Sequence, residues 1–95
     1  MGGVRVKVRF YARLRELIGF EELVLELGDP GFGFLMDELR KVLGRKAEYI
    51  FADGLTPRHG LLFSVNDKLI HPARLKSIEL KDGDIIDIMP PPSGG

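Results

Sequence analysis

The chain opens with an alternation of apolar and basic residues. In the stretch VRVKVRF, Val4–Phe10, every second residue is apolar, and Arg5, Lys7 and Arg9 stand between them. A period of two predicts a strand with one buried face. Because no aromatic residues separate the three basic residues, we expect a solvated sheet face rather than a nucleic-acid-binding surface.

A short helical segment and a second strand are predicted next. Leu14, Leu17 and Ile18 fall at helical spacing within residues 11–19, and Gly19 suits the C-terminal end of a helix. The stretch ELVLEL, residues 22–27, predicts a strand that lies antiparallel to the first. The GDPG sequence that follows then breaks this strand.

One strong amphipathic helix is predicted over residues 32–44. Its apolar stripe consists of Leu35, Leu39, Val42 and Leu43, the charged residues lie largely opposite, and Gly44 stops the helix. This helix should cover one face of the sheet. The GFGF sequence at its start could suggest a phosphate-binding loop, but no Lys-Ser/Thr pair follows and the spacing is not GxGxxG.

The second half of the chain predicts more strands after an irregular stretch. Residues 45–60 have no regular pattern and are expected to form a loop without an assigned role. Strands are predicted at Leu61–Val65 and Lys68–His71, joined by a tight turn at Asn66–Asp67. Residues 75–80 read as a connector with apolar anchors, and KDGD, residues 81–84, as a turn before the final strand, Ile85–Met89.

The alternation of residues along the final strand predicts which of its side chains are exposed. Ile86 and Ile88 share one face, whereas Ile85, Asp87 and Met89 share the other. An unpaired aspartate is not expected in a core. We therefore expect Met89 on the outer face, as an exposed thioether suited to partner docking.

The chain ends in PPPSGG, Pro90–Gly95. Proline lacks an amide donor and fixes φ, so this segment cannot continue the sheet and favours a stiff spacer. Gly94 and Gly95 have no side chains and can enter a narrow channel. Fully extended, such a tail reaches about 20 Å. We predict a domain over residues 1–89 and a flexible tail over 90–95.

The amino-acid composition excludes several classes of function. At 95 residues the chain is long enough for one domain, and its 14 basic residues balance its 14 acidic ones, so no global field attracts nucleic acid or an anionic membrane. No transmembrane run or signal peptide is apparent, and a cytoplasmic protein is expected. Cysteine is absent, which excludes thiolate chemistry. His59 and His71 have no second ligand at metal-like spacing and are expected to be loop histidines.

The order of elements indicates an α+β fold. Strand, strand, helix, strand, short strand and strand, with one covering helix, fit a ubiquitin-like β-grasp. Its mixed sheet would have four to five strands. The first strand would lie beside the last and parallel to it, since a long crossover separates them.

Several segments, taken in order, resemble the MoaD/ThiS family of ubiquitin-like sulfur carriers. They are VRFYARLRELIG, SVNDKLI and LKDGDIIDIMPPPSGG, in a chain of similar total length. Within the family the resemblance is to the small subunit of molybdopterin synthase. The family usually has Thr-Val at the start of the main helix, where this chain has Gly31-Phe32.

The resemblance implies a role for the C-terminus. An adenylating enzyme of the MoeB/ThiF type would use ATP to activate the carboxylate of Gly95, which would become a thiocarboxylate. A MoaE-like large subunit would then accept the tail, with Gly94 threading its channel, and sulfur would pass to the pterin precursor of the molybdenum or tungsten cofactor. Tyr11, Arg15, Leu69, Met89 and Pro90 match partner-facing positions. The domain itself would bind no cofactor or metal and would not be catalytic alone.

Three alternatives stay open. The chain could be a ubiquitin-like protein modifier, similar to the small archaeal modifiers, that is conjugated to lysines through Gly95. It could be the sulfur carrier of the thiamin pathway, whose members are usually shorter. It could also be a β-grasp interaction domain with an inert tail.

Overall fold

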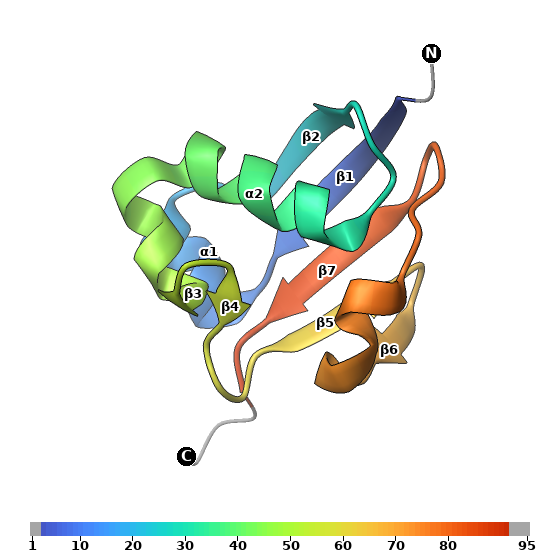
Figure 1. The fold of residues 1–95 in the computed structure, drawn as a ribbon. Coiled ribbons are helices and arrows are strands. Elements are labelled where there is room, and N and C mark those ends of the chain that lie inside the picture. Colours follow the sequence, from blue (N-terminus) through green and yellow to red (C-terminus); the bar gives the residue numbers. More distant parts are fainter. Residues whose placement is uncertain (1–2, 92–95) are drawn as a thin grey trace.

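The computed structural model describes residues 3–91 and confirms the α+β architecture. Its elements follow in the order β1 (Val4–Phe10), α1 (Ala12–Ile18), β2 (Glu22–Leu27), α2 (Phe32–Leu43), η1 (Gly44–Tyr49), β3 (Phe51–Asp53), β4 (Thr56–Pro57), β5 (Leu62–Val65), β6 (Lys68–Ile70), η2 (Pro72–Ser77) and β7 (Ile85–Met89). Here η1 and η2 are 3-10 helices. Figure 1 shows α2 lying across one face of the sheet.

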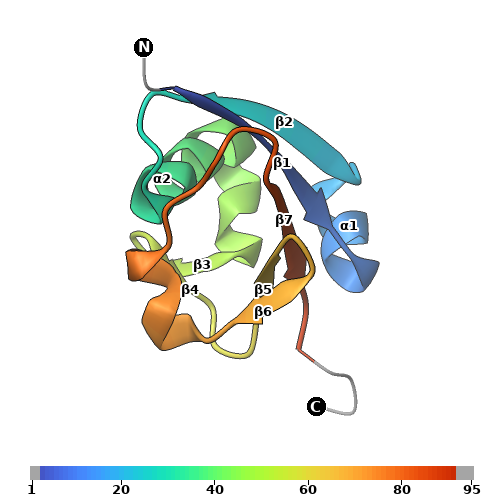
Figure 2. The same cartoon turned by 90° about the vertical axis from the view of Figure 1, so that its right-hand side faces the viewer.

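Five strands form one mixed sheet in the order β2-β1-β7-β5-β6. As predicted, β1 pairs with β2 antiparallel and with β7 parallel. Strand β7 is therefore central, with β1 on one side and β5, antiparallel, on the other. Figure 2 shows α2 on one side of β1 and β7, where it covers a single face of the sheet. The fold is a ubiquitin-like β-grasp.

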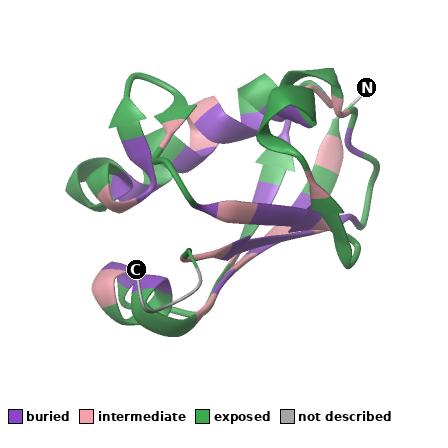
Figure 3. Cartoon of the chain, turned by 90° about the horizontal axis from the view of Figure 1, so that it is seen from below, coloured by how far each residue is buried: buried purple, intermediate pink, exposed green. Residues whose placement is uncertain are grey.

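The core lies between α2 and this sheet. The alternating apolar residues of β1 are buried from Val6 onward, and Ile86 and Ile88 of β7 are fully buried, as their parity predicted. Phe32, the first residue of α2, meets Phe63 of β5 edge to face with ring centroids 6.1 Å apart. Buried positions fall on the central strands and α2, whereas most connecting loops are exposed (Figure 3).

Predicted helix ends and the tight hairpin turn are confirmed. Helices α1 and α2 end at Gly19 and Gly44, whose φ angles are +98° and +58°, a region that favours glycine. Asn66 and Asp67 both have positive φ, at 50° and 71°, as a two-residue turn between β5 and β6 requires.

Four details of the sequence-based expectations were wrong. Val42 was expected in the buried stripe of α2 but is 49% exposed, and Met36 is buried in its place. Residues 45–60 are not an irregular loop, because most of η1 and the β3–β4 hairpin occupy them. The connector before β7 includes part of η2, and the short strand ends at Ile70 rather than His71. The error at Val42 has a plain cause: helical spacing marks a stripe, but the neighbouring elements decide which edge of that stripe is covered.

Candidate functional site

The C-terminal end of β7 is the origin of the tail, and we call Met89, Pro90 and Pro91 the tail root. The last registered pairs of β7 are Ile88 with Phe10 of β1 and Met89 with Leu62 of β5. The tail root thus emerges from the central strand of the sheet, held from both sides. Pro90 and Pro91 carry no amide hydrogen, so the ladder cannot continue through them. The sequence predictions for Gly94 and Gly95 lie outside the described residues.

A row of outer-face residues crosses the whole sheet just before the tail root. The register places Glu22, Arg9, Asp87, Ser64 and Leu69 side by side on β2, β1, β7, β5 and β6. The prediction that the basic residues of β1 lie on a solvated sheet face is confirmed for Arg5 and Lys7, and only in part for Arg9. Its side chain is 35% exposed and pairs with Asp87 instead of projecting into solvent alone.

Asp87 is the centre of a buried polar cluster on this face. Arg9 donates to both carboxylate oxygens, from Nε at 2.7 Å and from Nη2 at 3.1 Å. The Tyr11 hydroxyl donates to Oδ1 at 3.1 Å, and the Ser64 hydroxyl donates to Oδ2 at 3.4 Å. The Arg9 guanidinium carbon also lies 5.8 Å from the centre of the Tyr11 ring. Asp87, only 5% exposed, is therefore paired despite its burial.

The cluster shifts the pKa values of its members. Burial by itself raises the pKa of Asp87, but the hydrogen bonds from Arg9, Tyr11 and Ser64 outweigh burial and hold that pKa below its ordinary value. Burial, followed by the hydrogen bond to Asp87, raises the pKa of Tyr11. At neutral pH the cluster consequently contains an ionised carboxylate, a guanidinium and a neutral phenol. It is a tie between β1, β5 and β7 rather than an acid–base site.

The structure brings Tyr11, Met89 and Pro90 together at one end of the sheet. The backbone N–H of Tyr11 donates to the carbonyl of Ile88 at 3.3 Å, which places Tyr11 beside the tail root. Met89 does lie on the outer face, but its predicted exposure was wrong, because it is half-buried. Pro90 is likewise half-buried. Tyr11 is neither core nor free, since its ring is partly covered and its hydroxyl is bound.

Leu69 and Arg15 lie farther from the tail root. Leu69 is on the same outer face, on edge strand β6, and is 66% exposed. Arg15 is exposed on α1, with its guanidinium 3.6 Å from the carboxylate of Glu21. That ion pair belongs to the connection between α1 and β2. Whether any of these side chains meets a partner stays a prediction.

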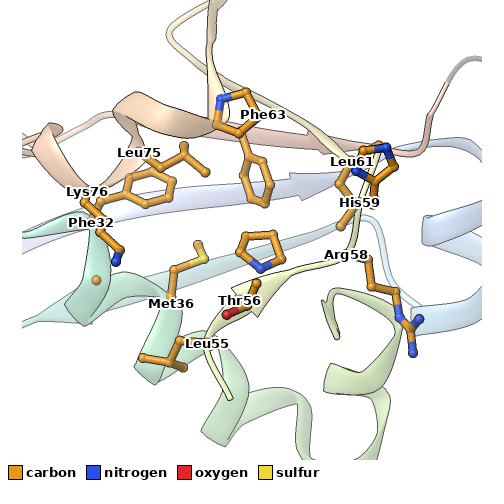
Figure 4. Close-up of a pocket in the computed structure, with 14 residues that line it drawn as sticks. Phe32, Met36, Leu55, Thr56, Arg58, His59, Leu61, Phe63, Leu75 and Lys76 are labelled. Carbon is orange, nitrogen blue, oxygen red and sulfur yellow. The ribbon is translucent and has the colours of Figure 1, made fainter. Parts of the chain in front are cut away.

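An apolar hollow of about 620 Å³ lies on the other side of the sheet. Figure 4 shows Phe63 and Met36 pointing into it from the sheet and from α2, whereas Arg58 points away. His59 and Gly60 form part of its rim. Sequence reasoning missed this hollow because the β3–β4 segment that closes it had no recognisable pattern.

The described residues were also compared with the requirements of a metal site and of a membrane span. They contain no group of three or more histidine, cysteine, aspartate or glutamate side chains placed to hold a metal ion. His71 accepts a hydrogen bond from the backbone N–H of Ala73 at 3.1 Å and caps η2, so it acts as a structural loop residue. Within the same residues, no helix is long and apolar enough to cross a membrane.

Comparison with known proteins places the chain in a family. The model of the ThiS family matches residues 8–95. The chain is 32% identical over 92 residues to the molybdopterin synthase sulfur carrier subunit of Chlamydomonas reinhardtii, covering 97% of this chain and all of that protein.

Two solved structures extend the similarity to three dimensions. Small archaeal modifier protein 1 of Methanosarcina acetivorans superimposes with a TM-score of 0.80 at 28% identity, covering 100% of both chains. A putative molybdopterin converting factor, subunit 1, from Pyrococcus furiosus has a TM-score of 0.68 at 30% identity, covering 94% of this chain and 99% of its own.

Proposed function

The chain belongs to the ThiS family, and from this premise we propose that it is a sulfur carrier that acts through the carboxylate of Gly95. The observation that carries the proposal is the family match itself, which extends through the C-terminal Gly94-Gly95 pair. The similarity to a molybdopterin synthase sulfur carrier subunit over nearly the whole of both chains supports the same role.

The chemistry follows from the properties of a terminal carboxylate. It is ionised at neutral pH, so one oxygen can attack the α-phosphorus of ATP while pyrophosphate leaves. The resulting acyl adenylate is a better electrophile than the carboxylate. A sulfur donor at the oxidation level of sulfide attacks the acyl carbon, AMP leaves, and a thiocarboxylate remains on Gly95. The absence of cysteine fits a carrier whose sulfur resides on the main chain.

The domain contributes a fixed origin for the tail. Strand β7 is paired on both sides and tied through Asp87 to β1 and β5, so the tail root is held while the following residues enter an enzyme. We propose two partners in consequence: an adenylating enzyme that uses ATP, and a large subunit of the molybdopterin synthase type that receives the thiocarboxylate. The chain by itself is proposed as a substrate and carrier rather than as a catalyst.

A second candidate function is conjugation to other proteins. The similarity to a small archaeal modifier protein over the full length of both chains favours it. Both functions begin with the same adenylation of Gly95. They differ in the acceptor of the activated acyl group, which is a sulfur donor in one case and a lysine amine in the other.

Mass spectrometry of the intact chain tests the proposal. We expect the full chain, with activating enzyme, ATP and sulfide, to gain the mass of one oxygen-to-sulfur replacement. Deletion of Gly95 should abolish this gain and leave the melting temperature nearly unchanged. A chain with a C-terminal amide is the matched control, because it keeps every residue and removes only the carboxylate.

Three results would contradict the sulfur-carrier proposal, and each has a different meaning. A sulfur gain on the amidated chain would place the sulfur elsewhere and refute the proposal. A large loss of stability on deleting Gly95 would mean that the tail is packed structure. Lysine residues carrying a Gly-Gly remnant in the host, without a thiocarboxylate, would favour the modifier function.

A further inference from the structure

Gly60 lies against the tail root. A Cβ atom placed on Gly60 would stand 3.1 Å from Cβ of Pro91 and 3.3 Å from its Cγ. Gly60 also has a φ of +90°, which residues with side chains rarely adopt. Pro91 therefore rests on the bare backbone of Gly60, and any side chain there would push the two segments apart.

The turn that carries Gly60 is itself anchored. The N–H of Arg58 donates to the carbonyl of Ile50 at 2.7 Å, and Nε of Arg58 donates to the carbonyl of Glu48. The N–H of Leu61 closes the turn onto the carbonyl of Arg58 at 3.3 Å, and the Leu61 side chain is buried in the core. The turn is consequently anchored to η1 at its start and to the core at its end. The position of Gly60 between these anchors is therefore fixed.

Three constraints meet at this point in the chain. The sheet ladder holds the residues of β7 through Met89. The rings of Pro90 and Pro91 fix the φ angles of the next two residues. A residue that precedes a proline is also limited to extended ψ values, which leaves a range of directions rather than one. The contact of Pro91 with Gly60 narrows that range further.

We propose that Gly60 is a positioning residue that sets the direction in which the C-terminal tail leaves the domain. This inference rests on the proposed function, because the direction of the tail matters only if enzymes act on its end. A tail held in one direction loses less freedom on entering an active site than a tail free to swing. No sequence pattern indicated this role, since residues 45–60 matched no motif and Gly60 was interpreted as part of a turn.

Gly60→Ala tests the proposal, with Gly83→Ala as the matched control. Gly83 also has a φ of +90°, but a Cβ there would meet nothing within 4 Å. Both variants carry similar backbone strain, and only Gly60→Ala collides with Pro91. With an activating enzyme that adenylates the wild-type chain, we expect Gly60→Ala to raise the KM for the carrier about 3- to 10-fold beyond Gly83→Ala, measured by pyrophosphate release.

A double variant separates positioning from damage to the fold. Pro91→Gly removes the two atoms with which the new methyl group would collide. It should itself raise KM, and adding Gly60→Ala to it should raise KM no further, because the contact is already gone. Independent effects of the two changes would contradict a shared role.

The contact can be observed without enzymology. In the NMR spectrum of the full chain we expect a nuclear Overhauser effect between the α protons of Gly60 and the ring protons of Pro91, and we expect Gly83→Ala to retain it. Absence of this signal in the wild type, or equal KM values for the two alanine variants, would overturn the inference. Failure of the wild-type chain to release pyrophosphate would instead refute the proposed function, while the NMR signal still decides the contact.

Discussion

Replacing Asp87 by asparagine is expected to destabilise the domain more than its conservative chemistry suggests. The amide has the shape of the carboxylate but no charge, and its NH2 group cannot accept from Arg9 or Tyr11. Its one carbonyl oxygen can still accept, so the variant keeps at most one of the two bonds from Arg9, at 2.7 or 3.1 Å, without the charge, and it weakens the bond from the Tyr11 hydroxyl. The substitution therefore weakens the link between β1 and β7 beside the tail root.

The expected magnitude follows from burial. Loss of hydrogen bonds to a buried charged group costs roughly 1.5–3 kcal/mol, and stranding a partner in the interior costs more. Here Arg9 keeps 35% of its side-chain surface in contact with solvent, so water can take over part of the lost interaction. We expect Asp87→Asn to lower the free energy of unfolding by about 2 kcal/mol, which corresponds to roughly 8–16 °C in melting temperature for a domain of this size.

Urea unfolding followed by circular dichroism measures this change. Glu26→Gln is the control, because Glu26 also pairs with an arginine of β1, Arg5, but both side chains are largely exposed, at 71% and 66%. Exposed pairs contribute little, so the control should leave stability unchanged. If Asp87→Asn and Glu26→Gln had equal effects, the cluster would not be the tie that the structure indicates.

The difference between wild type and Asp87→Asn should also depend on pH. The pKa of Asp87 in the folded state lies below its ordinary value of 3.8, so the carboxylate stabilises the fold fully above that value. This contribution is lost as the pH falls through the lowered pKa, because protonated Asp87 resembles asparagine. The two unfolding free energies should therefore converge at acidic pH. A difference that stayed constant down to the acid transition would contradict a role for the charge.

Two further substitution pairs probe the hairpin turn and the outer face. Asn66 and Asp67 both have positive φ, but among the described residues only the Asn66 side chain has hydrogen-bond partners: it donates to Asp84 at 2.8 Å and accepts from the N–H of Ile85 at 2.9 Å. In urea unfolding, Asn66→Gly should therefore destabilise the domain by about 1 kcal/mol more than Asp67→Gly. Equal losses of unfolding free energy in the two variants would show that the Asn66 side chain does not contribute to stability. Leu69 and Val24 are both exposed on edge strands, but Leu69 is on the β6 edge, in the row that contains Asp87. Leu69→Asp should therefore weaken binding to a molybdopterin synthase large subunit, measured by calorimetry, more than Val24→Asp does. Equal weakening would exclude Leu69 as a specific contact.

The sequence by itself determined the five strands of the main sheet, the two α-helices and the buried faces of β1 and β7. Alternation over Val4–Phe10 gave β1 and its buried side, and the parity of Ile86 and Ile88 gave the buried side of β7. Gly19 and Gly44 marked the helix ends, and Asn66-Asp67 marked the tight turn. These features follow from side-chain periodicity and local backbone preference, which a few neighbouring residues set. The family resemblance also followed from such ordered local segments.

Only the tertiary structure decided how distant segments meet. Arg9 and Asp87 are 78 positions apart, and their pairing depends on the register of two parallel strands, which no local pattern sets. The burial of Met89 depends in the same way on what packs beside it. The contact of Pro91 with Gly60 requires β7 and the turn after β4 to reach the same point in space. Periodicity assigns a residue to a face, but register and packing between segments determine what that residue touches there.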